Sequence, residues 1–495
     1  MRVILSRSGA MWGLFVASAG VALCAAQDAD AVRQPNVILI YTDDHAQWAV
    51  GAYGNKEIHT PNMDRLAVQG MRFTQGFTNP VCSPSRAMLL TGRYSHRAGI
   101  PDYIPYGNPI HVDNGLPAGT ATIASVLKGA GYATALVGKW HLGYGEKYYP
   151  ERFGFDQAEG YRYIAPGKRY DNVGRIPFLV GGREVERFRN DPRHTDILAD
   201  RAIRFIRAQR RNRFFLFLSI YQPHLPWQPV LEEDLAHYSD QPLTVPDTAR
   251  FPEVTLDEEK LRELTRLYYA NITGADRNIG RVLGALDELG LTENTLVFFI
   301  GDNGFNVGQH GLLGKGNARI LVVNERGGIS REKGTRPNMF DHSVLVPFVV
   351  RWPGVVKPGT TSDALVSTID ILPTLIDITG SPAGEKLQLD GRSMLPLLEG
   401  SSGVRWREAW FDTYDMIYLK ESHMRMIRTD HWKLVLHLDR NGLPLANGPR
   451  HELFNLDNDP AEVENLYGRQ LVVTDQQELE DGLRKWMREA GVTRE

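Results

Sequence analysis

Short apolar runs alternate with amphipathic stretches along most of the chain. Four runs rich in β-branched and aromatic residues predict buried strands, and they cover Val37–Tyr41, Ala133–Val137, Phe214–Ile220 and Thr295–Ile300. Between these runs apolar residues recur at helical spacing, which predicts helices over Thr122–Lys128, Thr195–Ala208 and Glu258–Leu289. Strands that alternate with helices indicate an α/β fold, with a large, mostly parallel mixed sheet sandwiched by helices.

The pattern changes after about Thr379. Loop-like segments lead to two short apolar runs, Met424–Ile427 and Lys433–Leu438, which predict a hairpin, and an amphipathic helix closes the chain. We therefore expect a large domain over residues 35–379 and a smaller C-terminal α+β subdomain over residues 380–495, built from a short antiparallel sheet and a helix.

The first 26 residues follow the pattern of an export signal. Arg2 and Arg7 precede an apolar run that is short for a membrane span and ends in small residues. We expect a signal peptide over residues 1–26, a mature chain without a transmembrane span, and a periplasmic or secreted protein. The alternatives are a short membrane anchor and a lipoprotein acylated at Cys24.

The amino-acid composition excludes several classes of protein. The 495 residues are 42% hydrophobic and 23% charged, which is an ordinary globular balance and excludes a disordered or fibrous protein. A net charge of −3 gives no reason to expect a nucleic-acid partner, so any anion site must be made locally. The two cysteines, Cys24 and Cys82, are too few for a disulfide framework, and only Cys82 remains after the predicted cleavage.

Acidic side chains follow two of the predicted strands. Asp43 and Asp44 follow the first, and Asp302 and Asn303 follow the last. Ligands of open α/β sheets bind at the carboxyl ends of strands, where these oxygens would meet. Such a set suits calcium best, while magnesium is possible and zinc fits less well. A single acidic pair is more often a turn or helix cap, but two pairs favour a metal site.

Basic side chains follow the other two strands. Lys139 and His141 lie two positions apart, so in an extended segment they point to the same side. His224 comes shortly after the third strand. A lone histidine is more often structural, but together these groups predict an anionic ligand at the same edge of the sheet.

Cys82 is followed by Ser83, a predicted helix N-cap, and by Pro84, the predicted first residue of that helix. Arg86 lies about one turn further along. A thiol at a helix N-terminus beside an arginine favours a low-pKa thiolate nucleophile. The alternative is a small buried residue at the start of a helix.

The sequence Cys-x-Pro-Ser-Arg from Cys82, followed by Leu-Thr-Gly-Arg at residues 90–93, resembles the signature of the type I, formylglycine-dependent sulfatases of the alkaline phosphatase-like superfamily. The resemblance covers nearly all of the expected mature chain, and several ordered motifs are more specific than any single one. The other similar segments are Asn36–Asp44, Thr60–Ala67, Gly138–Gly143, Tyr268–Ala270, Asp276–Arg281, Gly301–Gly304, Pro347–Gly354, Glu452–Leu456 and Asp459–Glu462.

The resemblance implies a sulfatase that releases inorganic sulfate, with residues 35–379 as the catalytic domain. Exported sulfatases of this type commonly act on sulfated polysaccharides or oligosaccharides. The resemblance also implies that a maturation enzyme oxidises Cys82 to formylglycine, whose hydrate is the covalent nucleophile. One calcium ion would be held by Asp43, Asp44, the modified Cys82, Asp302 and Asn303. Arg86, Lys139, His141, His224 and Lys315 would complete the catalytic set.

The segment around Lys315 departs from the family pattern. The stretch Ala318–Lys333 separates it from the continuation that begins at Gly334. This stretch is either a surface insertion or a substrate-binding loop that rims the cleft. Lys333 is a weaker rival for the lysine at the leaving-group side.

Four further residues are candidates for substrate binding. Trp227 could stack on a sugar, and Arg336, His423 and Arg425 could bind sugar carboxylates or hydroxyls. Packing is the commoner role for each of them taken singly. Two alternative functions stay open: a phosphonate or phosphodiester hydrolase of the same superfamily, and a non-catalytic sugar-binding relative.

Overall fold

The computed structural model describes residues 34–105, 113–161, 175–180, 183–189, 192–323, 329, 334–445 and 449–492. The predicted signal peptide, with Cys24, lies outside these residues. Within the described part of the chain, no helix combines the length and the apolar character that a membrane crossing requires.

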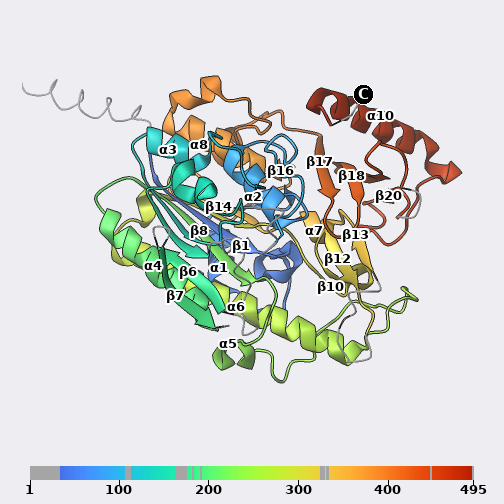
Figure 1. Ribbon diagram of the computed structural model, residues 1–495, viewed down its shortest axis with the longest axis horizontal. Coiled ribbons are helices and arrows are strands. Elements are labelled where there is room, and N and C mark those ends of the chain that lie inside the picture. The colour runs from blue at the N-terminus through green and yellow to red at the C-terminus, as the bar shows by residue number, and fades with distance from the viewer. Residues whose placement is uncertain are drawn as a thin grey trace, which may run out of the picture.

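A ten-stranded mixed sheet forms the centre of the molecule (Figure 1), in the order β15-β2-β14-β9-β1-β8-β4-β5-β6-β7. The four predicted strands are confirmed as its parallel centre: β9 (Thr295–Gly301), β1 (Asn36–Asp43), β8 (Phe214–Pro223) and β4 (Ala133–Gly138). The flanking strands are β15 (Thr360–Ser362), β2 (Met71–Phe73), β14 (Phe348–Arg351), β5 (Gln157–Tyr161), β6 (Arg175–Val180) and β7 (Arg183–Arg189).

Both faces of this sheet are covered by helices, because the central strands are apolar on both sides. Ile38 and Ile40 face a core shared with α1 (Pro61–Gln69), α4 (His194–Gln209) and α6 (Glu258–Glu288). Val37, Leu39 and Tyr41 face the opposite core, shared with α2 (Cys82–Thr91), α3 (Ile123–Gly129) and α8 (Ile371–Thr379). The predicted α/β architecture is therefore confirmed.

The long helix α6 runs without a break through Gly274 and Gly280. At these positions a Cβ atom would lie 2.8 Å from Asp234 Oδ2 and 2.5 Å from Asn62 Cγ. The two glycines thus allow neighbouring segments to approach the helix closely and do not interrupt it.

A smaller antiparallel sheet lies towards the C-terminus, in the order β17-β18-β19-β20 (Figure 1). It contains the predicted hairpin and is covered by the closing helix, whose Leu479, Leu483 and Met487 pack on it. Met394 and Leu398, beyond the predicted boundary at residue 379, still pack against the large core. The elements are β17 (Ala409–Met416), β18 (Ser422–Thr429), β19 (Trp432–Leu438), β20 (Glu452–Asn455) and α10 (Val473–Ala490).

A second small sheet, which the sequence pattern did not predict, joins the two parts. Its strands are β10 (Asn306–Val307), β11 (Leu312–Gly314), β12 (Asn317–Ile320) and β13 (Thr335–Pro337). The tight turn between β11 and β12 carries Lys315. The remaining short elements are α5 (Glu232–Ala236), α7 (Asp341–Val344), α9 (Leu395–Leu398), β3 (Gly76–Phe77) and β16 (Val366–Ser367).

Candidate active site

Four oxygen-bearing side chains meet at the carboxyl ends of β1 and β9. The two strands are parallel neighbours, with Thr42 paired to Gly301, so the residues that follow them lie side by side. The Asp44 backbone N–H donates to Asp302 Oδ1 at 2.9 Å. The Asn303 amide donates to Asp44 Oδ1 at 2.9 Å. These residues and Asp43 are buried, so the sheet topology gathers the predicted oxygen set in one place.

Three cationic side chains surround these carboxylates. The Arg86 guanidinium is fully buried and donates to Asp302 Oδ2 at 3.1 and 2.7 Å. Lys139 pairs with Asp43, and Lys315 pairs with Asp44. Because three positive charges face three negative ones, the buried group is close to neutral as a whole, which limits the cost of burying it.

The two buried carboxyls of Asp43 and Asp302 respond differently to this environment. Burial and the charge of Asp43 raise the pKa of Asp302 to about 7. Burial would also raise the pKa of Asp43, but the charges of Lys139, His224 and Arg86 lower it well below its usual range. Asp43 Oδ1 is buried and has no hydrogen-bond partner among the described residues. An unpaired carboxylate oxygen of this kind fits a cation ligand.

Cys82 is the first residue of α2 and is only 2% exposed. Its Sγ lies 3.3 Å from His141 Nδ1, and His141 Nε2 lies 3.0 Å from the Ile104 carbonyl oxygen. Since a carbonyl oxygen only accepts, Nε2 carries the proton and Nδ1 accepts from the thiol. The geometry therefore orients a histidine lone pair towards residue 82.

Two local expectations for Cys82 are wrong. The helix begins at Cys82 with Val81 as its N-cap, while Ser83 lies inside the helix and accepts from the Ile104 N–H at 3.2 Å. Burial raises the pKa of the Cys82 thiol, although Lys139 and Lys315 lower it. The unmodified residue is therefore a buried thiol rather than an activated thiolate.

His224 lines the same cavity as His141 and lies beside Asp44. Its Nδ1 donates to the Leu225 carbonyl oxygen at 2.5 Å, and its Nε2 lies 3.8 Å from Asp44 Oδ2. Burial lowers its pKa, although Asp44 and Asp43 raise it. Lys315 lies beside the same carboxylate. Burial alone would lower its pKa, but Asp44 and the other neighbouring negative charges raise it.

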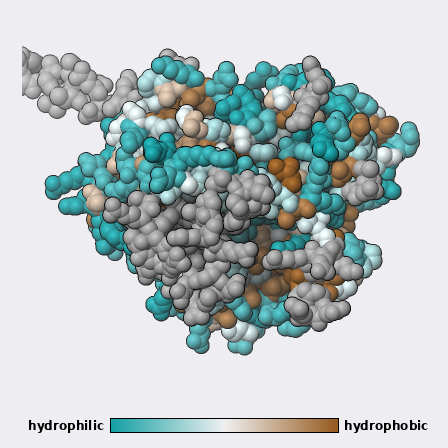
Figure 2. Space-filling model, in the orientation of Figure 1, coloured by the Kyte–Doolittle hydropathy of each residue, from teal (hydrophilic) through white to brown (hydrophobic). Residues whose placement is uncertain are grey.

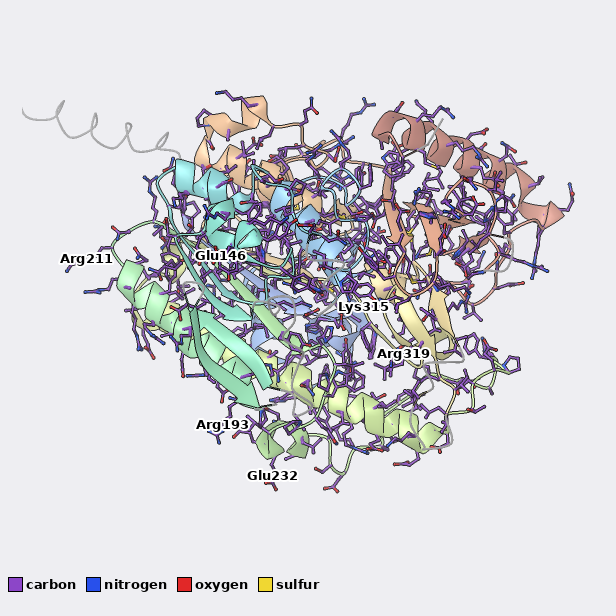
Figure 3. The ribbon with its side chains drawn as sticks, in the orientation of Figure 1. Glu146, Arg193, Arg211, Glu232, Lys315 and Arg319 are labelled. Carbon is purple, nitrogen blue, oxygen red and sulfur yellow. The ribbon has the colours of Figure 1, made fainter. Side chains whose placement is uncertain are left out.

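Five residues of this cluster, Asp44, Cys82, His141, His224 and Lys315, line a cavity of about 600 Å³. Figure 2 shows apolar side chains gathered near the middle of this face, beside the C-terminal sheet. Lys315 lies near the centre of the molecule and Arg319 farther out on the same small sheet (Figure 3). The lining residues are Asp44, Cys82, Tyr103, His141, His224, Leu225, Pro226, Phe305, Leu313, Gly314, Lys315, Asn317, Arg319 and Leu419.

The start of the stretch Ala318–Lys333 contributes to this cavity. Arg319 lies on β12 and lines its wall, which favours the interpretation of this stretch as a rim of the cleft. Lys333, the rival lysine, falls outside the described residues.

The four candidate substrate-binding residues do not line the cavity. Trp227 is buried in the core, where its indole N–H donates to the Pro223 carbonyl oxygen at 2.6 Å. Arg336 pairs with Glu452 at 3.0 Å. The other two, His423 and Arg425, both bind Asp415, at 2.9 and 2.6 Å. Their polar groups are directed to partners within the fold.

Ser219, Tyr103 and Leu419 are among the site residues that the sequence analysis did not select. Ser219 is buried on β8 and accepts from Arg86 Nη1 at 2.7 Å. Its hydroxyl is the single one in an otherwise apolar run, and this exception in the pattern could have identified Ser219 from the sequence. Tyr103 and Leu419 line the cavity from loops, where no periodic pattern marks them.

A large mixed sheet with carboxylates and basic side chains at the ends of its central strands agrees with an alkaline phosphatase-like hydrolase, the class of enzyme that the sequence resemblance implied. The chain belongs to the sulfatase family: the family model described as Sulfatase matches residues 35–381. A second model, N-sulphoglucosamine sulphohydrolase, C-terminal, matches residues 335–489. The resemblance found in the sequence is therefore confirmed, and the protein is an enzyme of this family.

Individual relatives agree with this assignment. The chain is 33% identical to steryl-sulfatase of Mus musculus, in an alignment that covers 75% of this chain and 66% of the relative. It is 26% identical to N-acetylglucosamine-6-O-sulfatase of Bacteroides thetaiotaomicron, over 94% of this chain and 88% of the relative. A solved structure of a protein with its substrate D-glucosamine-2-N,6-O-disulfate shares the fold, with a TM-score of 0.73 and 24% identity over 92% of this chain and 98% of the other.

Proposed function

We propose that this protein hydrolyses sulfate esters of a sulfated oligosaccharide or polysaccharide, with formylglycine at position 82 and one calcium ion. The observation that carries the proposal is that Cys82, Asp44 and Lys315 line one cavity, while the other two carboxylates and two cations are buried in the same ion-pair network. The similarity to a relative named for N-acetylglucosamine 6-sulfate chemistry over nearly the whole chain supports a sugar substrate. We further propose that the protein is exported and that residues 1–26 are its signal peptide.

The calcium ligands in this proposal are Asp43, Asp44, Asp302 and Asn303, together with residue 82. They are hard oxygen donors, the kind that calcium prefers, and Asp43 Oδ1 has no protein partner among the described residues. Calcium bound there supplies positive charge that polarises a sulfate oxygen. Arg86 donates two hydrogen bonds to Asp302, which keeps that carboxylate fixed as a ligand.

His141 is the proton acceptor for residue 82 in this proposal. Its Nδ1 lies 3.3 Å from the side chain of residue 82, while its Nε2–H is held by the Ile104 carbonyl oxygen. The lone pair on Nδ1 therefore faces the group that must lose a proton. The Lys139 ammonium, paired with Asp43, adds positive charge near the same position.

His224 and Lys315 act on the leaving alcohol. Both line the cavity beside Asp44. The charged Lys315 ammonium stabilises the developing alkoxide, and the imidazolium form of His224 carries a proton at Nε2 that it can donate.

Mass spectrometry of the Cys82 peptide from active protein tests the nucleophile. We expect the aldehyde in place of the thiol, and an intact thiol in fully active protein would overturn the mechanism. Sulfate release from sulfated sugars should disappear in Cys82→Ala, while His431→Gln, at an exposed site on the C-terminal unit, should keep it. A large preference for aryl phosphonate over aryl sulfate esters would assign the chain to the phosphonate hydrolases instead.

A further inference from the structure

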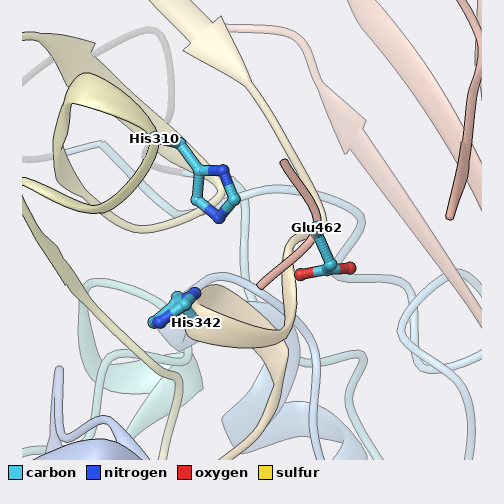
Figure 4. Close-up of side chains that lie close together, drawn as sticks. All are labelled: His310, His342 and Glu462. Atoms are coloured by element: carbon cyan, nitrogen blue, oxygen red, sulfur yellow. The ribbon is translucent and has the colours of Figure 1, made fainter. Parts of the chain in front are cut away.

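A second group of metal-ligating side chains lies outside the catalytic cavity. His310 follows β10, His342 belongs to α7, and Glu462 comes from the C-terminal part of the chain. One potential ligand atom from each residue lies within 4.8 Å of the other two. Figure 4 shows both imidazoles and the carboxylate turned towards a common gap.

Two imidazole nitrogen atoms of this group are buried without being satisfied. No described residue makes a hydrogen bond to His310 Nε2 or to His342 Nδ1. His310 is only 7% exposed, and its ring stacks on Phe340 with the centroids 3.6 Å apart. Because an unpaired buried polar atom costs free energy, two of them facing one gap point to a ligand that satisfies both.

Both imidazoles are in the form that binds metals. Burial disfavours the charged form of an imidazole, so both rings favour the neutral form. Their lone pairs are therefore available without the loss of a proton.

Glu462 is already held in position by its neighbours. Its Oε2 accepts from the Asp341 N–H at 2.6 Å, and its Oε1 lies 2.6 Å from Lys433 Nζ. The same ammonium pairs with Asp341 at 2.8 Å, so its charge is shared between two carboxylates. Each carboxylate oxygen has a second lone pair, which leaves Glu462 able to bind a cation.

We propose that His310, His342 and Glu462 form a second metal site, one for a zinc ion. Two histidines and a glutamate are a common zinc set, whereas calcium prefers oxygen ligands alone. Zinc bonds of about 2.0–2.1 Å place tetrahedral ligands roughly 3.4 Å apart, so ligand atoms that now lie within 4.8 Å of one another need to approach by up to about 1.4 Å. His310 and His342 also line a hollow of about 260 Å³, which gives water access as a fourth ligand.

The bound ion would link two parts of the chain. His310 lies two positions before the start of β11, and the β11–β12 turn carries Lys315. Glu462 belongs to the segment that follows β20. Zinc at this position therefore fixes the C-terminal unit against the small sheet that forms one wall of the catalytic cavity.

The test uses the full chain saturated with calcium and freed of transition metals. Equilibrium titration with Zn²⁺ should show one site per chain, and Co²⁺ should give the visible absorption of a four-coordinate ion. His342→Gln should weaken Zn²⁺ binding at least tenfold and remove the cobalt spectrum. The matched control is His431→Gln, since His431 is exposed and pairs with Asp457 at 3.0 Å.

A further variant separates this site from the catalytic one. Asp43→Asn should keep full Zn²⁺ stoichiometry, because Asp43 belongs to the catalytic site. Zinc should also raise the melting temperature of the wild-type protein but not that of His342→Gln. The proposal fails if calcium-saturated wild-type protein binds no Zn²⁺, if His342→Gln binds it equally well, or if Asp43→Asn abolishes the binding.

Discussion

The hydroxyl of Ser219 offers a sharp test of how the catalytic cluster is held. It accepts from Arg86 Nη1 at 2.7 Å, and both side chains are fully buried. Replacing it with alanine removes one oxygen and leaves the guanidinium bound to Asp302 and to the Lys139 carbonyl oxygen at 3.1 Å. A hydrogen bond to a charged group contributes about 1.5–3 kcal/mol. Because other acceptors remain, we expect a loss of about 1.5–2 kcal/mol of stability.

The same change should slow the reaction. A shift of Arg86 moves Asp302, a proposed calcium ligand, and each loss of about 1.4 kcal/mol in transition-state stabilisation lowers the rate tenfold. We therefore expect kcat of Ser219→Ala to fall by roughly tenfold, with a smaller change in KM.

Denaturant unfolding and steady-state sulfate release measure the two effects. Thr379→Val is the matched control, because its buried hydroxyl donates to the neutral Leu375 carbonyl oxygen at 2.7 Å, far along the chain from the site. This control substitution should lower the free energy of unfolding by about 1 kcal/mol and leave kcat unchanged. A Ser219→Ala protein with wild-type stability and kcat within twofold would show that Ser219 does not hold Arg86 in place.

Three further results are expected. Chelation of calcium should abolish sulfate release, with recovery on adding Ca²⁺; activity that survives exhaustive chelation would argue against the metal. Arg319→Ala should raise KM for charged sugar sulfates several-fold with little change in kcat, and an unchanged KM would remove Arg319 from the substrate site. Burial raises the pKa of Asp102 to about 6, so the folded protein binds its proton more tightly than the unfolded chain. The contribution of Asp102 to stability should therefore fall by roughly 3 kcal/mol as pH rises from about 4 to about 6, and Asp102→Asn should remove this contribution from the profile. Denaturant unfolding at several pH values checks this, and parallel profiles for the two proteins would contradict it.

Much of the fold follows from local pattern in the sequence. The central strands are continuous apolar runs, and the helices between them repeat at regular spacing, so both were predictable. The strands β10 to β13 were not, because each has only two to four residues and no period to detect. β10, β11 and β12 pair as local hairpins, and only the pairing of β12 with β13 spans a longer stretch of chain.

Part of the candidate site could likewise be predicted from the sequence, and part of it could not. Asp43 and Asp302 directly follow parallel strands, and the topology of such a sheet brings strand ends together, so their meeting was predictable. Trp227 and Arg425 were chosen for their chemistry, but their orientation depends on the partners Pro223 and Asp415. A single sequence does not reveal which of its polar groups are already satisfied within the fold.

The burial of Cys82 sets an order of events during biosynthesis. With 2% of its surface exposed, this residue is out of reach of any second protein once the chain has folded. The fold around this residue is completed late in synthesis. Asp102 accepts a hydrogen bond from the hydroxyl of Tyr414, which lies 312 positions further along the chain. The proposed oxidation must therefore act on an unfolded or partly synthesised chain. A host that folds this protein faster than it modifies it would accumulate an intact but inactive enzyme.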